Sequence, residues 1–155
     1  CQSFVEDGRL TKNNFEDFIN ILADNVAKYK KLYIKLHPRS RMEYYAALEN
    51  NPNVNFTHDL PICKYYIGHY SGLLAAVKQI SDNILIWKLK DHYTPPYFLQ
   101  YGSVVTDNEN DLKDFIHGQI KNNNSSSIKK FTQKELDAFD PIKTIAENII
   151  KYSIS

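Results

Sequence analysis

Three short groups of polar residues along the chain have side chains that can do chemistry. The first is a pair of carboxylates before a glycine, Glu6-Asp7-Gly8; the second is a basic group around His37-Pro38; the third is the turn from Gly68 to Gly72. A carboxylate can take a proton as a general base, and histidine, lysine and serine can stabilise the charge that grows on a leaving phosphate. The three groups therefore favour a site for an anionic ligand such as a phosphate.

The basic group follows an apolar run, Leu32 to Leu36, which is typical of a buried strand. Pro38 cannot donate to a sheet ladder and pushes His37 toward extended geometry, so the strand must end there. Ligands of open α/β sheets bind where strands end in this way. Four cationic or protonatable side chains lie at this end and suit an anion: Lys35, His37, Arg39 and Arg41. The alternative is a solvated basic turn without a ligand.

The third group joins a strand to a helix. An apolar stretch over 63–67 stops at Gly68, and apolar residues at helical spacing begin at Leu73, so Ser71 is the expected N-cap. Backbone N–H groups at the start of a helix bind anions readily. The alternative is that Ser71 only caps the helix.

The remaining elements are predicted from the spacing of apolar residues. Helices are expected over 12–30, 41–50, from 107 or 108 to 120, and from Thr132 to Ile149 with a division at Pro141; strands are expected over 32–36, 54–56, 63–67, 84–89 and within 97–105. This alternation predicts an α/β fold, a Rossmann-like parallel sheet with helices on both faces. Residues 1–155 form a single domain in this prediction, with a flexible loop over 122–127.

Composition argues against several classes of protein. A chain of 155 residues with 43% hydrophobic and 24% charged residues suits one folded domain, and a net charge of +1 argues against nucleic acid as a partner. Two cysteines, Cys1 and Cys63, cannot form a disulfide scaffold, so a reducing compartment is expected. No apolar run approaches the length of a membrane span. A start at Cys1 without an initiator Met is expected of a piece cut from a longer protein.

Two acid-histidine neighbours, His58-Asp59 and Asp91-His92, raise the question of a metal. Side chains adjacent in sequence rarely point at one ion, and no third ligand follows at helical spacing, so the prediction is that no metal is bound. A nucleophilic pair of Cys63 and His69 is a further alternative. Because Cys63 begins an apolar strand, it is instead expected to be packed.

The three groups, in their order along the chain, resemble the motifs of bacterial sialyltransferases, in particular the lipooligosaccharide sialyltransferases and the capsule polysialyltransferases. Those families carry an acidic-acidic-glycine motif, a His-Pro motif and a serine motif, which match Glu6-Asp7-Gly8, His37-Pro38 and Tyr70-Ser71. The resemblance extends to about Leu74. It departs from the pattern at Gly72, where many relatives have a second hydroxyl residue. These enzymes have two Rossmann-like lobes (GT-B type), and the chain length matches only the C-terminal, nucleotide-binding lobe.

The resemblance implies transfer of sialic acid from CMP-sialic acid to a sugar hydroxyl, with inversion and without a metal or other cofactor. Asp7 would be the catalytic base, with Glu6 as the less favoured candidate, and His37 would stabilise or protonate the leaving phosphate. The donor and its phosphate would contact a further set of residues: Lys35, Arg39, Gly68, Tyr70 and Ser71.

The implied partners are a nucleotide sugar and a glycan acceptor. The implied location is the cytoplasm or the inner face of the bacterial inner membrane, with attachment to the membrane through parts outside this sequence and a homodimer left open. Two alternatives remain at this stage. One is a nucleotide-binding or interaction domain that performs no chemistry, and the other is a donor lobe that uses a UDP- or GDP-sugar.

Overall fold

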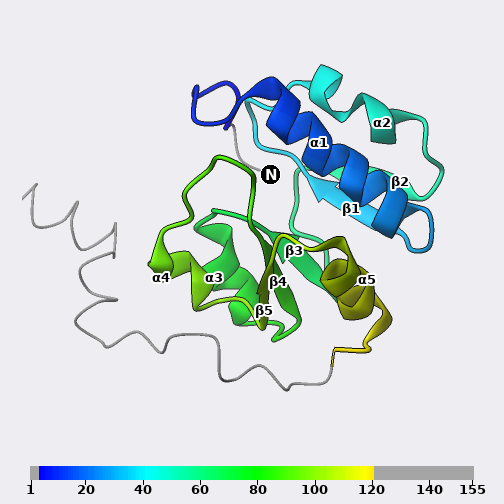
Figure 1. The fold of residues 1–155 in the computed structure, drawn as a ribbon. Helices are drawn as coiled ribbons and strands as arrows, with labels where there is room; N and C mark the ends of the chain where they lie inside the picture. Colours follow the sequence, from blue (N-terminus) through cyan, green and yellow to red (C-terminus); the bar gives the residue numbers. More distant parts are fainter. Residues whose placement is uncertain (1–3, 121–155) are drawn as a thin grey trace, which may run out of the picture.

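The computed structural model describes residues 4–120 (Figure 1). The helices are α1 (Lys12–Leu22), the π-helical turn η1 (Ala23–Ala27), the 3₁₀ turn η2 (Met42–Tyr45), α2 (Ala46–Glu49), α3 (Leu73–Lys78), α4 (Pro96–Leu99) and α5 (Glu109–His117). The strands are β1 (Leu32–Lys35), β2 (Val54–Thr57), β3 (Tyr66–Gly68), β4 (Ile84–Trp87) and β5 (Val104–Thr106). The expected loop over 122–127 and the expected helix from Thr132 lie outside the described residues.

The two longest helices begin and bury their apolar faces as their sequences predict. The Thr11 side chain accepts a hydrogen bond from the amide of Asn14 and caps α1. Asn108 caps α5 in the same way, and Gly118 ends it in the left-handed conformation at φ 69°. Their buried side chains follow the helical period: Phe15, Phe18, Ile19 and Leu22 in α1, and Leu112, Phe115 and Ile116 in α5.

All strand pairs are parallel, but they form two sheets. β1 pairs with β2, with Ile34 opposite Phe56, and the second sheet has the order β3-β4-β5, with Ile86 opposite both Gly68 and Val105. The α/β architecture with parallel strands is thus confirmed. The expectation of a single sheet is wrong for the described residues, because β1 and β3 do not pair.

The strand β4 is the centre of the second sheet and is covered on both faces. Its four residues are all buried, and they alternate between two apolar clusters. Leu85 and Trp87 belong to the cluster shared with α1, β1 and α5, and Ile84 and Ile86 belong to the cluster with α3 and α4. Phe18 of α1 stacks on Trp87 with ring centroids 6.0 Å apart, which joins the β1-β2 half to the β3-β4-β5 half.

Several predicted boundaries move. The helix expected over 12–30 stays α-helical only to Leu22 and continues as η1, and the helix expected over 41–50 begins as a 3₁₀ turn. Most of the segment 97–105 is α4 and its following loop rather than strand, because Pro95 and Pro96 start a helical turn and β5 begins at Val104.

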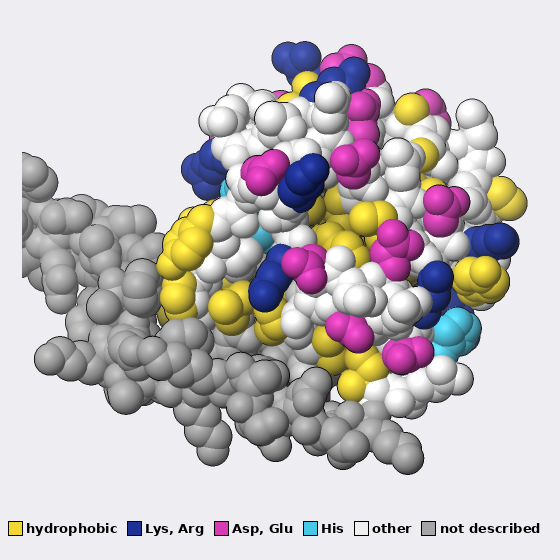
Figure 2. All heavy atoms as spheres, in the orientation of Figure 1, with side chains coloured by type: hydrophobic (Ala, Val, Ile, Leu, Met, Phe, Trp, Pro, Cys, Tyr) yellow, Lys and Arg dark blue, Asp and Glu magenta, His cyan; other side chains and the backbone are white. Residues whose placement is uncertain are grey.

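On one face, apolar side chains lie in a hollow between charged side chains of both signs (Figure 2). Within residues 4–120, no helix is both long enough and apolar enough to cross a membrane.

Candidate functional site

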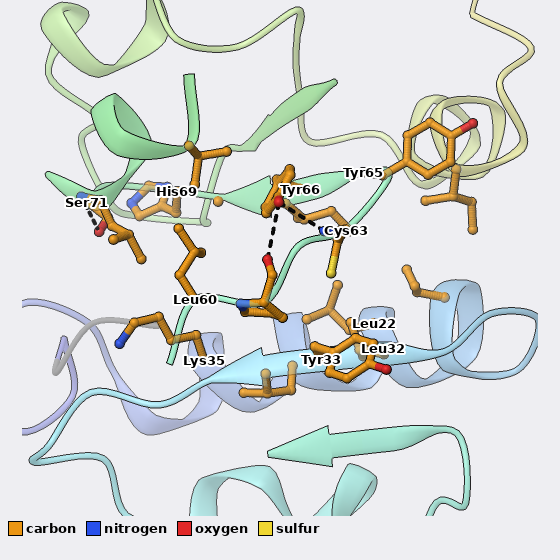
Figure 3. A pocket seen from close by; sticks show the side chains of 18 of the residues that line it. Leu22, Leu32, Tyr33, Lys35, Leu60, Cys63, Tyr65, Tyr66, His69 and Ser71 are labelled. Carbon is orange, nitrogen blue, oxygen red and sulfur yellow. Dashed lines mark hydrogen bonds between the residues drawn. The ribbon is translucent and has the colours of Figure 1, made fainter. Parts of the chain in front are cut away.

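A pocket of about 440 Å³ lies between β1 and β3, the two strands that face one another without pairing (Figure 3). The carboxyl ends of both strands lie at the same end of this pocket. Lys35 marks the end of β1, and His69 and Ser71 follow β3 (Figure 3). The prediction that the second and third groups reach one cleft is therefore met for Lys35 and Ser71.

The pocket has an apolar wall with cationic side chains around it. Leu22, Leu32, Leu60, Tyr66 and Leu74 are among its apolar lining residues. Four lysines also line the pocket: Lys30, Lys31, Lys35 and Lys64. None of the described residues that line it carries a carboxylate. An anionic ligand with a planar or apolar part would fit this combination of charge and surface.

The acidic loop and the His-Pro loop contact one another. Arg39 Nη2 lies 2.8 Å from Asp7 Oδ1, and the backbone N–H of Arg41 donates to Glu6 Oε1 at 3.1 Å. The side chain of Asp7 is 21% exposed, so it remains accessible from solvent. Gly8 has φ 68°, a left-handed conformation in which glycine avoids the strain of a side chain, and its amide donates to the carbonyl of Val5. The first two predicted groups thus form one surface.

His37 is half-buried and its ring bonds to its own loop. Nδ1 accepts from the backbone N–H of Arg39 at 3.2 Å, and the His37 amide donates to Ser40 Oγ at 3.1 Å. Because Nδ1 accepts, the proton of the neutral ring is assigned to Nε2. An Nε2–H group can donate to a phosphate oxygen while the ring is neutral. His37 is not among the residues that line the pocket.

The third group does not form the cap that its sequence predicts. The helix α3 begins at Leu73 and has six residues, with Gly72 rather than Ser71 at the N-cap position. Ser71 Oγ accepts from the amide of Leu73 at 3.2 Å, so it still binds a backbone donor of this turn. A helix this short offers little dipole to an anion, and the expected anion site at a helix start is reduced to Ser71 and its turn.

Gly68 and Tyr70 have packing contacts at this end of the pocket. A Cβ on Gly68 would lie 2.6 Å from Leu74 Cδ2, so the missing side chain allows β3 and α3 to approach. Tyr70 packs on Phe98 with ring centroids 4.5 Å apart, and more loosely on Phe4 at 6.0 Å. Both residues also line the pocket, as the expected donor-binding role requires.

The contacts among Phe4, His69 and His92 could not be predicted from the sequence. His69 is 5% exposed, with Nδ1 2.8 Å from the carbonyl oxygen of Trp87 and Nε2 2.7 Å from His92 Nδ1. Burial lowers the pKa of His69 to about 4; the charge of His92 acts in the same direction, and the Trp87 carbonyl opposes it. Since His69 and His92 are far apart in sequence, their contact left no local pattern to detect.

The residues considered for a metal site and for a nucleophilic thiol have other contacts in the structure. Asp91 Oδ2 accepts from Asn14 Nδ2 at 3.4 Å, and Asp59 donates its amide to Thr57 Oγ1. Within the described part of the chain, no group of three or more His, Cys, Asp or Glu side chains is arranged to hold a metal ion. Cys63 lines the pocket, and burial raises the pKa of its thiol, which disfavours a nucleophilic thiolate.

The structure thus joins the first group to the second by an ion pair and the first to the third through Phe4. Comparisons with protein-family models, with curated proteins and with solved structures found no match.

Proposed function

We propose that this chain is the nucleotide-binding lobe of a glycosyltransferase that moves sialic acid from CMP-sialic acid to a sugar hydroxyl, with inversion and without a metal. The observation that carries the proposal is the ion pair between Asp7 and Arg39. It brings the acidic motif against the loop that holds the His-Pro motif, although the two are separated by a helix and a strand. A base and a phosphate-binding group must be close to one another for such a transfer.

The order of the strands supports a donor site at this place. If β1 and β3 are neighbours, the strand order across the molecule is β2-β1-β3-β4-β5, a common doubly wound order in Rossmann-like folds. In this order, β2 is added on one side of β1, and the later strands are added on the other side, from β3 onward. Ligands of such sheets bind at the carboxyl ends of the two strands where the order of addition reverses, here β1 and β3. Lys35 and Ser71 are at these ends.

In the proposed reaction, the carboxylate of Asp7 takes the proton of the acceptor hydroxyl as that oxygen attacks the anomeric carbon of sialic acid. The bond from that carbon to the phosphate oxygen of CMP breaks, and the electron pair leaves with the phosphate. His37 Nε2–H, Lys35 and Ser71 supply donors for the charge that develops there. Arg39, which belongs to the His-Pro loop, holds Asp7 through their ion pair. Glu6, whose carboxylate accepts from the Arg41 amide, is the alternative base.

Calorimetric titration with CMP, UMP and GMP tests the donor. We expect CMP to bind and the other two nucleotides to bind at least about tenfold more weakly, a difference that one base-specific hydrogen-bonded contact can provide. Equal affinity for all three would contradict a CMP-sugar donor and favour a lobe for another nucleotide sugar.

The same ion pair also fits a second function, a nucleotide-binding domain that performs no chemistry. In that case Asp7 only fixes the loop, and Asp7→Asn and Arg39→Gln should have the same effect, because each breaks the pair. If Asp7 is the base, Asp7→Asn in the protein that holds both lobes should lower kcat by about 10²- to 10⁴-fold and leave CMP affinity nearly unchanged. Arg39→Gln keeps the carboxylate and removes only its ion-pair partner, so it should lower kcat by a smaller factor than Asp7→Asn.

A further inference from the structure

Two imidazoles, one buried and one half-buried, contact Phe4 just before the acidic loop and have no role assigned so far. His69 follows β3 and His92 follows β4, and the two rings have centroids 4.6 Å apart. The Phe4 ring covers both, at 5.4 Å from His69 and 5.1 Å from His92. Phe4 itself is 5% exposed, so this contact is part of the packed interior.

The hydrogen bonds of the pair determine where its protons lie. The carbonyl oxygen of Trp87 can only accept, so His69 carries its proton on Nδ1, where the Thr94 hydroxyl oxygen also lies at 3.3 Å. Nε2 of His69 must then accept from His92 Nδ1–H, 2.7 Å away. With His92 as the Nδ1–H donor, a second proton on His69 would place two N–H groups against one another. This assignment of the pair has a neutral His69, in keeping with the pKa that burial lowers.

The pair contacts the chain just before the two carboxylates. The amides of Arg9 and Leu10 donate to the carbonyl of Phe4, which closes the loop that carries Glu6 and Asp7. At its other side, this loop is held by the ion pair of Asp7 with Arg39. Phe4 and that ion pair are thus two attachments that set the place of Asp7.

The charges around the pair disfavour its protonation. The positive charge of Arg9 disfavours protonation of His92, and the charge of His92 disfavours protonation of His69. The carboxylate of Asp91, the residue before His92, is bonded to Asn14 on α1. The other close neighbours, Phe4, Tyr70 and the Thr94 hydroxyl, are uncharged.

We propose that the neutral His69–His92 pair is a positioning unit that holds Phe4 and, through it, places the Glu6-Asp7 loop beside the His-Pro loop. Its importance for catalysis rests on the proposed role of Asp7, but the docking of residues 4–10 does not. His69 and His92 are positioning residues here, because their contacts reach Asp7 only through Phe4. Protonation of His69 would break its bond to His92 and loosen the loop.

Two variants of His92 separate the hydrogen bond from the bulk of the ring. The side-chain amide nitrogen of asparagine can take the place of Nδ1, so His92→Asn keeps the donor to His69, whereas His92→Leu removes it. Hydrogen exchange of the Gly8, Arg9 and Leu10 amides reports loop docking, because each of them donates within the loop. The amides of α5 serve as the control for global stability.

At pH 7 we expect His92→Leu to lower the protection of the loop amides by about tenfold, roughly the effect of losing one buried hydrogen bond. His92→Asn should keep that protection, and the α5 amides should be unchanged in both. Nitrogen NMR of the wild type should find His69 neutral with its proton on Nδ1, and the loop should lose protection as His69 becomes protonated.

Equal loss of protection in the loop and α5, unchanged protection of the loop amides in His92→Leu, or a proton on Nε2 of His69 would each overturn the proposal. None of these measurements uses CMP, so they can fail separately from the proposed function.

Discussion

At the scale of single residues, the histidines divide into those that can meet a ligand and one that is built into the core. His37 is half-buried, and its nitrogen Nε2 can donate to an anion, since Nδ1 accepts from the Arg39 amide. His69 is nearly inaccessible, and both of its ring nitrogens are used within the protein. The sequence could not separate these roles, because His37 and His69 both follow the carboxyl end of a predicted strand.

The contrast predicts that His37→Ala affects binding rather than folding. Loss of one hydrogen-bond donor to a charged phosphate should weaken CMP binding by about 1.5–3 kcal/mol. The free energy of unfolding should fall by no more than about 1 kcal/mol, the value of the hydrogen bond between His37 and the Arg39 amide. Calorimetry and urea unfolding measure the two effects. His58→Ala, at an exposed histidine, is the matched control and should change neither. A loss of stability of about 2–5 kcal/mol, typical of a core deletion, would show that His37 is structural.

His69 predicts a dependence of stability on pH. Its pKa is lowered from 6.5 to about 4 in the folded chain, chiefly by burial. The unfolded chain therefore binds the proton first as the pH falls. Stability contributed by the neutral ring is present in full above about pH 6.5, falls between about 6.5 and 4, and is lost below; the total is about 3 kcal/mol. Burial and the charge of Arg9 lower the pKa of His92 as well, with the same sign.

Urea unfolding at pH 7, 5.5 and 4.5 measures this dependence. We expect His69→Asn to be less stable at pH 7 but to lose much less stability on acidification than the wild type. His58→Ala should keep the slope of the wild type. Parallel pH profiles for the wild type and His69→Asn would mean that His69 titrates at its ordinary value.

At the scale of elements, local pattern predicts what is locally determined. The apolar periodicity of α5 and of α1 taken together with η1, and the apolar runs of β1 and β4, all gave elements within a few residues of their observed bounds. The short strand expected within 97–105 is present only at its end, where β5 begins at Val104, because Pro96 and the contact of Phe98 with Tyr70 favour a helical turn before it. The place of Phe4 against His69 and His92 depends on contacts across the whole chain, which no window of sequence contains.

Two glycines of the third group provide a test of how β3 and α3 pack. Gly68→Ala should destabilise the fold by about 1–3 kcal/mol, because the new Cβ would lie 2.6 Å from Leu74 Cδ2 in a packed interface. Gly72→Ala is the matched control. It has φ −57° and nothing within 4 Å of a new Cβ, so it should be neutral or stabilising by up to about 1 kcal/mol. Thermal unfolding of both variants measures the difference, and equal stability would show that α3 moves away from β3 at no cost.

At the scale of the whole molecule, the two sheets share one apolar cluster but leave β1 and β3 unpaired across the pocket. The loops that carry the three predicted groups come from both halves. A ligand that contacts Lys35 and Ser71 together must therefore bridge the halves. The predicted motifs could indicate that these loops converge, since parallel strands end at one edge, but they could not indicate that the strands between them remain apart.

The last prediction separates binding from chemistry at this scale. The proposed phosphate contacts of His37, Lys35 and Ser71 all lie within the described residues, so the 155-residue chain should bind CMP on its own, though weakly. Transfer also requires an acceptor held in line with the donor, and that positioning provides much of the rate enhancement of such enzymes. We therefore expect calorimetry to detect CMP binding. Product analysis with CMP-sialic acid and a sugar acceptor should detect no turnover. Ser71→Ala and His37→Ala should each weaken CMP binding, and His58→Ala should not. Unchanged affinity in the first two variants would place the nucleotide elsewhere on the molecule, whereas turnover by the isolated chain would mean that residues 1–155 hold the acceptor as well, contrary to a lobe that only binds the donor.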